Sequence, residues 1–554
     1  MTPEQLSSLI VDAVADLVAE GAVTLPDGVP ASVTVERPRV REHGDYATNV
    51  ALQLAKRAGT DPRAFARLVA ARLRDRPGIA AVEIAGPGFL NISVEAGAQG
   101  VLAAEIVASG PAYGHNDVLA GQKVNVEFIS ANPTGPLHLG HTRWAVVGDA
   151  ISRVLEAAGA EVTREFYIND RGTQMDLFGA SLEARALGRP VPEDGYLGSY
   201  VADLAAAVVA ADPGIVDLPE PERLVAFREA GYAVQLTEQK AQLDAFHTHF
   251  DVWFSERSLH DSDDVVAGLE KLRDQGHLYD ADGALWMRTT DFGDDKDRVL
   301  VRSNGELTYF ASDTAYYVDK RARGFDKLLY LLGADHHGYV GRLRAMAACT
   351  GDDPDQTIEV LIGQLVKIMR GDEEVRLSKR SGELITLHEL MEEIGVDALR
   401  YSLARYPSDS PLTLDIDHIT RTTSDNPVYY VQYAHARVAS LLRNAADLGL
   451  LPEKETFDPS LLTHEKEGEL LRALAEFPRV VAAAAQLREP HRVARYLEET
   501  AATYHRFYDS CRVLPLGQEE VTDLHRARLV LVAATRVVLA NGLDLLGVTA
   551  PERM

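Results

Sequence analysis

Two histidines separated by a leucine and a glycine, His138 and His141, are the side chains whose types and spacing best suit chemistry. A loop with two prolines precedes them and apolar residues at helical spacing follow, so they open a predicted helix. A helix N-terminus suits phosphate, and Gly140 lets a flat ring or a phosphate approach the backbone. Imidazole N–H groups can donate to phosphate oxygens as charge redistributes at phosphorus. The pattern indicates a phosphate-handling site; the alternative is an ordinary loop and first helical turn.

A second candidate for phosphate binding is the basic, glycine-containing stretch at residues 374–383. A mobile loop carrying Arg376, Lys379 and Arg380 could close on the oxygens of a triphosphate. Taken alone, however, the stretch is explained better by a solvated basic loop.

The elements that position the histidines form a strand–helix–strand unit. A strand at residues 123–129, the helix and a second strand at 162–168 predict parallel pairing with a right-handed crossover. A second half, with strands at 307–311 and 327–332 each followed by a helix, matches a doubly wound sheet. Ligands of such sheets bind beyond the carboxyl ends of the strands, where Asn132, both histidines and Asn169-Asp170 would lie.

The rest of the chain predicts a multidomain α/β protein with three parts. Residues 1–108 read as a small α/β unit and residues 109–396 as the parallel-sheet domain. Acidic, proline-broken helical stretches at about 173–305 look like an insertion in that sheet, with a strand at 250–256. Residues 397–554 follow an almost continuous helical pattern and predict an all-α domain.

Composition narrows the class of protein but not its partner. The 554 residues are 46% hydrophobic, and no run of about 18 apolar residues exists, so no membrane span is expected. The acidic, amphipathic N-terminus lacks the features expected of a signal peptide, so none is expected here. Two distant cysteines, Cys349 and Cys511, predict a reducing, cytoplasmic setting and no structural metal. The net charge of −27 argues against nucleic-acid binding, although a local basic face is compatible with it.

These residues resemble a known family. The stretch at 138–141 resembles the HIGH motif of class I aminoacyl-tRNA synthetases, and RLSKR at 376–380 resembles their KMSKS loop. The resemblance to arginyl-tRNA synthetases covers essentially the whole chain. It is carried by EFISANPTGPLHLGHTR, FYINDRGTQM, DKDRVLVRSNGELTYFASDTAY, GADHHGY, GVDALRY, NPVYYVQYAHAR and LGVTAPERM, with GDYATNVAL and GPGFLNI in the N-terminal unit. The fold it implies is a class I Rossmann-type catalytic domain with a helical anticodon-binding domain behind it.

The resemblance implies a reaction: arginine and ATP give arginyl-adenylate and pyrophosphate, and arginine is then transferred to tRNA-Arg. Family members generally need tRNA for the first step. The catalytic residues would be His138, His141 and Lys379. ATP would bring Mg²⁺ with it. The residues that would bind ATP are Gly140, Gln364, Leu365, Val366, Arg376, Ser378, Lys379 and Arg380. The KMSKS-like loop lacks the family's first lysine, its methionine and its last serine. The division of work among its basic residues is therefore open.

Arginine recognition needs acidic side chains, because a guanidinium is a planar fork that pairs with carboxylates. The resemblance implies Glu127, Asn132, Tyr309, Asp313 and His336 for this role. Asp313 also suits a helix N-cap, which is the better explanation without the resemblance. Glu127 needs a partner in any case, because it would lie in a buried parallel strand. No hydrolytic editing domain is expected.

The C-terminal helices would bind the anticodon by stacking splayed bases on aromatic and arginine side chains. The residues implied are Tyr429, Gln432, Tyr433 and Arg437, although a tyrosine stripe is more often part of a core. The N-terminal unit resembles one that contacts the tRNA elbow, and the family expectation is a monomer. The remaining alternatives are another class I synthetase, a nucleotidyltransferase with the same motif, and a non-catalytic RNA-binding relative.

Overall fold

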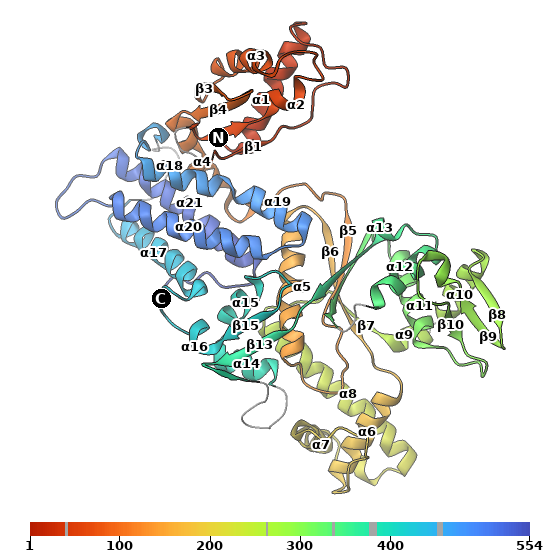
Figure 1. Ribbon diagram of the computed structural model, residues 1–554. Coiled ribbons are helices and arrows are strands. Elements are labelled where there is room, and N and C mark those ends of the chain that lie inside the picture. Colours follow the sequence, from red (N-terminus) through yellow and green to blue (C-terminus); the bar gives the residue numbers. More distant parts are fainter. Residues whose placement is uncertain (39–42, 262–263, 335–337, 376–384, 451–457) are drawn as a thin grey trace.

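Five parallel strands form the central sheet, in the order β12-β11-β5-β6-β7 (Figure 1). The structure is a computed structural model, and it describes residues 1–554 except 39–42, 262–263, 335–337, 376–384 and 451–457. The strands are β5 (Lys123–Glu127), β6 (Glu161–Ile168), β7 (Val252–Ser255), β11 (Lys327–Gly333) and β12 (Ile358–Gly363). The parallel, two-halved sheet expected from the sequence is confirmed.

Helix α5 (Leu139–Ala157) makes the crossover from β5 to β6, and most of its residues are buried. In the second half of the sheet, α11 (Tyr309–Ala322) precedes β11, and α12 (Tyr339–Cys349) and α13 (Pro354–Thr357) connect β11 to β12. The strand predicted at 307–311 is wrong, because α11 (Tyr309–Ala322) begins there. Thr308 has an extended backbone and its side chain accepts from the N–H of Ala311, so it is the N-cap that starts the helix.

The insertion between the two halves consists of two separate bodies (Figure 1). The first is helical and has its own apolar core; its elements are α6 (Thr173–Ala186), α7 (Ser199–Ala211), η3 (Pro213–Asp217) and α8 (Glu220–Ala245). The second contains an antiparallel sheet that the acidic sequence did not reveal. Its elements are α9 (Glu256–Asp261), α10 (Asp264–Asp274), β8 (Leu278–Ala281), β9 (Ala284–Met287), η4 (Thr289–Phe292) and β10 (Arg298–Val301).

The N-terminal unit has a four-stranded antiparallel sheet, in the order β1-β2-β4-β3, and an apolar core of its own. A capping box at Thr2 starts its first helix. The elements are α1 (Pro3–Ala19), β1 (Val35–Glu36), β2 (Tyr46–Thr48), α2 (Val50–Leu54), α3 (Pro62–Arg74), β3 (Ile79–Ala85) and β4 (Phe89–Val94). Helix α4 (Ala96–Ser109) and η2 (Gly110–Ala112) lead from it to the central sheet.

The chain after β12 forms a small sheet and then a helical domain. Strands β13 (Val366–Arg370), β14 (Glu373–Glu374) and β15 (Leu412–Asp415) make the sheet. The helices are α14 (Leu387–Ile394), α15 (Val396–Ala404), α16 (Ile416–Ile419), α17 (Pro427–Asp447), η7 (Pro459–Leu461), α18 (Glu465–Ala475), α19 (Phe477–Leu487), α20 (His491–Ser510) and α21 (Asp523–Leu545). No described helix has the length and apolarity needed to cross a membrane.

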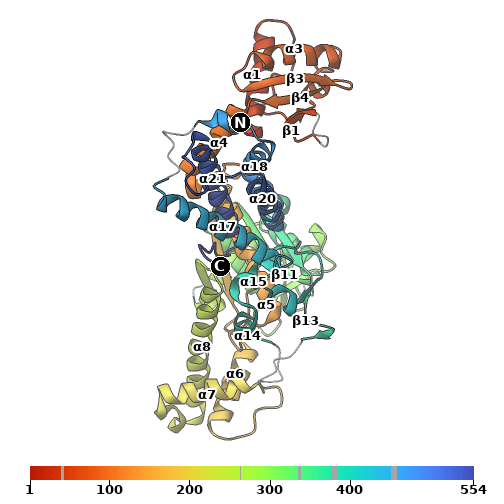
Figure 2. The same cartoon turned by 90° about the vertical axis from the view of Figure 1, so that its left-hand side faces the viewer.

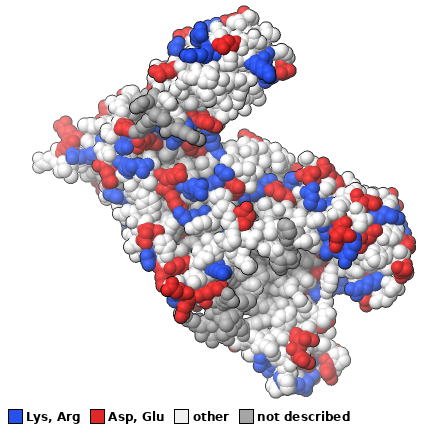
Figure 3. Space-filling model, viewed as in Figure 1, with Lys and Arg blue, Asp and Glu red and all other residues white. Residues whose placement is uncertain are grey.

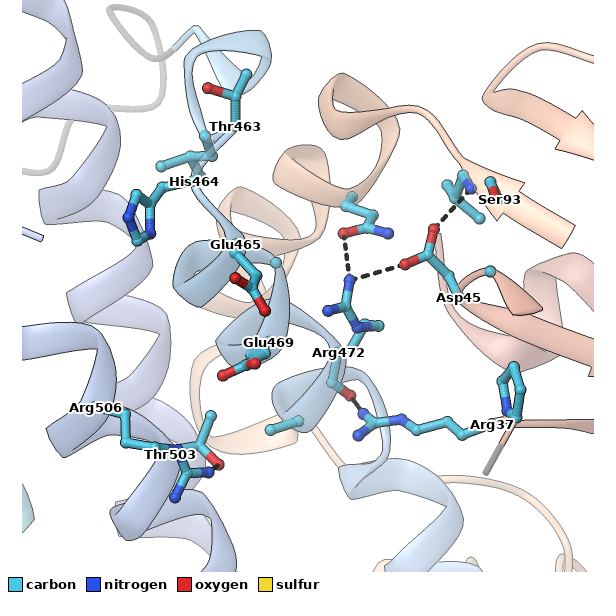
Figure 4. A pocket seen from close by; sticks show the side chains of 17 residues that line it. Arg37, Asp45, Ser93, Thr463, His464, Glu465, Glu469, Arg472, Thr503 and Arg506 are labelled. Atoms are coloured by element: carbon cyan, nitrogen blue, oxygen red, sulfur yellow. Dashed lines mark hydrogen bonds and ion pairs between the residues drawn. The ribbon is translucent and has the colours of Figure 1, made fainter. Parts of the chain in front are cut away.

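The parts are arranged as an elongated molecule, with the N-terminal unit at one end and α6 to α8 at the other (Figures 1 and 2). The N-terminal unit meets α18 around a cavity of about 790 Å³ (Figure 4). There Arg472 donates to Asp45 at 2.8 Å, and the guanidinium of Arg37 lies 3.3 Å from the carboxylate of Glu476. These ion pairs hold the N-terminal unit against the helical domain.

Candidate active site

His138 and His141 form the N-terminal cap of α5. The Nδ1 of His138 accepts from the N–H of Gly140 (3.1 Å), and the N–H of His138 donates to the Nδ1 of His141 (3.2 Å). Their ring centroids are 4.0 Å apart. Since each Nδ1 accepts a backbone hydrogen bond, a neutral ring carries its proton on Nε2, which remains a donor.

Burial keeps both imidazoles neutral near pH 7. It lowers the pKa of His141 to about 3, with a smaller contribution from His138, and it lowers the pKa of His138 below its usual 6.5. The helix therefore presents two uncharged N–H donors at its positive end. Such donors suit a phosphate whose charge is redistributing.

A cavity of about 610 Å³ opens beside this helix start. It lies between the start of α5 and the carboxyl ends of β11 and β12. The predicted residues that line it are His138, Gly140, Gln364, Leu365 and Val366. The predicted phosphate-loop residues Arg376, Ser378, Lys379 and Arg380 lie outside the described part of the chain.

Two further residues shape this cavity. A Cβ on Gly363 would lie 2.2 Å from the Trp144 ring, so only glycine lets β12 end against that ring. Arg143 is buried and donates to the main-chain oxygens of Gln364 (2.8 Å), Ser410 and Pro407. It thereby fixes the wall that carries Gln364. Sequence reasoning missed Arg143; the signal available was an arginine in the first turns of a helix that is otherwise buried.

An acidic cluster lies at the same edge of the sheet. Asp313 on α11 accepts from the hydroxyl of Tyr339 at 2.5 Å. The pKa of Asp313 is raised to about 6, chiefly by burial and also by the carboxylates of Glu256 and Glu127, while the Tyr339 hydrogen bond opposes the rise. The explanation of Asp313 as a helix N-cap is wrong, because Thr308 caps α11 and Asp313 lies inside the helix.

Glu256 is the acidic residue that sequence reasoning missed. It begins α9, directly after the edge strand β7, and burial raises its pKa although the hydroxyl of Tyr167 hydrogen-bonds to it. Asp170 fixes this position, because it accepts from the side chain of Ser255 (2.6 Å) and the N–H of Arg257 (3.2 Å). The available signal was a carboxylate at the end of a strand next to a predicted ligand edge.

Glu127, at the end of β5, has a partner within the chain. The Nζ of Lys320 lies 2.5 Å from its Oε2, and the Oγ of Ser130 donates to its Oε1. Lys320 is fully buried and stands over the rings of Tyr316 and Tyr330. The ion pair offsets the charge of Glu127, so Asp313 and Glu256 give the cluster most of its negative character.

The remaining residues predicted to bind arginine have different surroundings. Asn132 donates to the side-chain oxygen of Gln174 at 2.5 Å. Tyr309 begins α11 and is 67% exposed. Its hydroxyl lies near Gly172, since a Cβ added to that glycine would be 3.6 Å from it. His336 lies outside the described residues.

The predicted anticodon-reading stripe on α17 divides into two groups. Tyr429 and Tyr433 are stacked with centroids 6.0 Å apart, and Tyr433 is 41% exposed. The Arg437 guanidinium lies 4.0 Å from the centroid of Tyr508. Gln432, by contrast, is buried and donates to Asp397 (2.8 Å) and to the main-chain oxygen of Thr549 (2.9 Å). Its side chain joins α17 to the C-terminal segment.

Comparison with known proteins gives matches over nearly all of the chain. Residues 4–94 match the arginyl tRNA synthetase N terminal domain, residues 104–192 and 227–405 match the catalytic domain of tRNA synthetases class I (R), and residues 431–554 match the DALR anticodon binding domain.

Full-length relatives agree. Arginine–tRNA ligases of Frankia alni and Kineococcus radiotolerans are 58% and 57% identical to this chain, each over 100% of both chains. The arginyl-tRNA synthetase structures from Thermus thermophilus and Plasmodium falciparum share the fold, with TM-scores of 0.74 and 0.71 at 23% and 16% identity over 100% of both chains. With histidines capping α5 at the edge of a parallel sheet, and with family matches in all three parts, the chain belongs to the arginyl-tRNA synthetases.

Proposed function

We propose that the chain joins L-arginine to tRNA-Arg in two steps at the carboxyl edge of its parallel sheet. Arginine and ATP first give arginyl-adenylate and pyrophosphate; arginine then passes to the terminal ribose of the tRNA and AMP is released. One observation supports this most strongly. The same sheet edge carries neutral histidine donors beside a cavity and, at the ends of β5 and β7, an acidic cluster suited to a guanidinium.

The histidines would act on ATP. The Nε2–H groups of His138 and His141 would stabilise the charge that builds up on the α-phosphate oxygens as the arginine carboxylate attacks phosphorus. The adenine would lie against Gly140 and the wall from Gln364 to Val366. The β- and γ-phosphates would fall to the loop that carries Arg376, Ser378, Lys379 and Arg380.

Mg²⁺ would arrive with ATP. Among the described residues, no group of three or more histidine, cysteine, aspartate or glutamate side chains could hold a metal ion. The donors would therefore come chiefly from phosphate oxygens, as is usual for this ion. The ion would neutralise charge on the leaving pyrophosphate.

The acidic cluster would select arginine. Asp313 would pair with the guanidinium, with Glu127, Tyr309 and the newly found Glu256 around it, while Asn132 and His336 would hold the substrate backbone. The geometry of a planar fork between carboxylates disfavours lysine, whose ammonium is a single point charge. The raised pKa of Asp313 fits this role, because a bound cation would favour its charged form.

The tRNA would span the elongated molecule. We infer functional units at residues 1–108, 109–396 and 397–554, which contact the elbow, the acceptor end and the anticodon. Tyr429, Tyr433 and Arg437 offer flat faces to unstacked bases, and Gln432 would support them from inside. Lys and Arg side chains are interspersed with acidic ones on the face in Figure 3. Local basic side chains would therefore contact the tRNA phosphates, despite the negative net charge of the protein.

We further propose a cytoplasmic monomer; two buried thiols, Cys349 and Cys511, suit a reducing compartment. The test of the proposed function is ATP-dependent incorporation of labelled arginine into total tRNA by the wild-type protein. We expect labelled tRNA only when ATP is present. Absence of charging by wild-type protein that binds tRNA would favour a non-catalytic relative instead.

A further inference from the structure

The loop between β5 and α5 has a strained beginning. Ile129 and Ser130 have φ angles of +68° and +45°, a region that non-glycine residues rarely adopt and that is especially unfavourable for a β-branched side chain. Such a conformation persists only where its surroundings hold it. Because residues 129–137 lead from Glu127 to His138, this strain lies between the two halves of the active site.

Both ends of this loop are tied to the catalytic domain. The Oγ of Ser130 accepts from the N–H of Tyr167 at 3.2 Å, and the N–H of Leu387 donates to the oxygen of Leu137 at 2.8 Å. These contacts leave the middle of the loop, residues 132–135, to be held by other elements.

The helical unit of the insertion holds that middle section. On α8, the Nε2 of Gln239 donates to the main-chain oxygens of Asn132 (3.2 Å) and Gly135 (2.8 Å). On α7, the hydroxyl of Tyr200 donates to the oxygen of Thr134 at 2.9 Å. On α6, Gln174 accepts from the Asn132 side chain. Each of the three long helices thus contributes one side chain to the loop.

These contacts differ in burial: the Asn132–Gln174 bond is exposed and the Tyr200 bond is partly buried, whereas the Gln239 side chain is buried. Gln239 is 1% exposed although it lies on a long helix with many polar residues. A buried amide costs free energy unless its groups are bonded, so the two hydrogen bonds of its Nε2 favour this position on α8, although its Oε1 has no partner among the described residues. A Cβ on Gly135 would lie 3.2 Å from the Tyr200 hydroxyl, so the loop approaches α7 closely.

We propose that Tyr200 and Gln239 are positioning residues, and that α6 to α8 form a clamp that holds residues 129–137 in the conformation that receives arginine. The proposal rests on the function proposed above, since it assigns the clamped loop to the arginine site. It gives the insertion a role in substrate geometry. Without the clamp the strained backbone at Ile129 relaxes, and Asn132 leaves its place beside the site.

The first test compares Tyr200→Phe and Gln239→Leu with matched controls in ATP–pyrophosphate exchange at saturating tRNA. Tyr196→Phe removes a hydroxyl from the same helical unit at a ring packed on Phe178, and Gln242→Leu removes an α8 amide that bonds only to Glu238 among the described contacts. We expect KM for arginine to rise at least about fivefold in the two test variants, the factor that one net hydrogen bond represents. In the test variants KM for ATP should stay at the wild-type value. In the control variants KM for both arginine and ATP should stay at wild-type values.

The second test uses the strained position itself. In the Gln239→Leu background, Ile129→Gly and Ile129→Ala remove the same packing, but only glycine adopts the +68° φ without strain. We expect glycine to lower KM for arginine toward wild type and alanine not to do so. Equal values for the two, or a wild-type KM in Tyr200→Phe, would overturn the clamp. If wild-type protein itself shows no arginine-dependent exchange, the proposed function fails instead.

Discussion

Replacing Asp313 by asparagine should stabilise the protein and weaken its binding of arginine. Burial, with Glu256 and Glu127, raises the pKa of Asp313 from 3.8 to about 6. Between these values the folded protein holds a proton that the unfolded chain releases, so stability falls as pH rises through this window. The loss in the free energy of unfolding is complete at pH 7. It is at most about 3 kcal/mol, since each pH unit between the folded and unfolded pKa represents about 1.4 kcal/mol. Partial exposure of Asp313 makes the real value smaller.

Asparagine removes this loss of stability while it keeps an oxygen for the hydroxyl of Tyr339. It also removes the charge that is proposed to pair with the guanidinium. A hydrogen bond to a charged group contributes about 1.5–3 kcal/mol, so KM for arginine should rise by roughly ten- to a hundredfold.

The assay combines thermal unfolding at pH 5 and pH 7.5 with ATP–pyrophosphate exchange. Asp313→Asn should raise the melting temperature at pH 7.5 more than at pH 5. Thr308→Ala is the matched control, because it removes the α11 cap at a cost of about 1 kcal/mol and leaves the carboxylate in place. An Asp313→Asn protein with wild-type KM for arginine, or one less stable at pH 7.5, would refute this reasoning.

Three other predictions follow from the same site. His141→Ala should lose pyrophosphate exchange while a filter-binding assay still detects tRNA binding; wild-type exchange would remove the histidine from the mechanism. Gly363→Ala should raise KM for ATP by roughly tenfold, because overpacking against Trp144 costs about 1–3 kcal/mol, and an unchanged KM would show that the wall is not in contact with ATP. The kcat/KM for arginine should fall as pH drops through about 6, where Asp313 of the free protein takes up a proton, and Asp313→Asn should lack this step.

Sequence alone predicted those parts of the site whose signals are local. The histidine pair, the glycine between them and the apolar repeat of α5 lie within one short stretch, so their spacing already implied a helix cap at a sheet edge. The parallel order of the sheet followed from alternation of strands and helices.

The rest depended on contacts between distant residues. Residues 307–311 contain the β-branched and aromatic types that favour a strand, but Thr308 acts as the N-cap of a helix that begins at Tyr309. Glu127 pairs with Lys320, which is 193 positions away in the sequence. Glu256 lies at the site because β7 joins the sheet after the helical unit α6 to α8. The sequence places Glu256 at the end of a predicted strand, but no local pattern shows which edge of the sheet that strand joins or which residue pairs with Glu127.

The most direct test of the central claim is ATP–pyrophosphate exchange by the wild-type protein, scanned over all twenty amino acids with and without total tRNA. The proposed site predicts exchange with arginine and with no other amino acid, because the Asp313 cluster is proposed to accept a guanidinium. The family expectation adds that this exchange needs tRNA. Exchange driven by another amino acid would keep the histidine chemistry and contradict the acidic cluster as the arginine site.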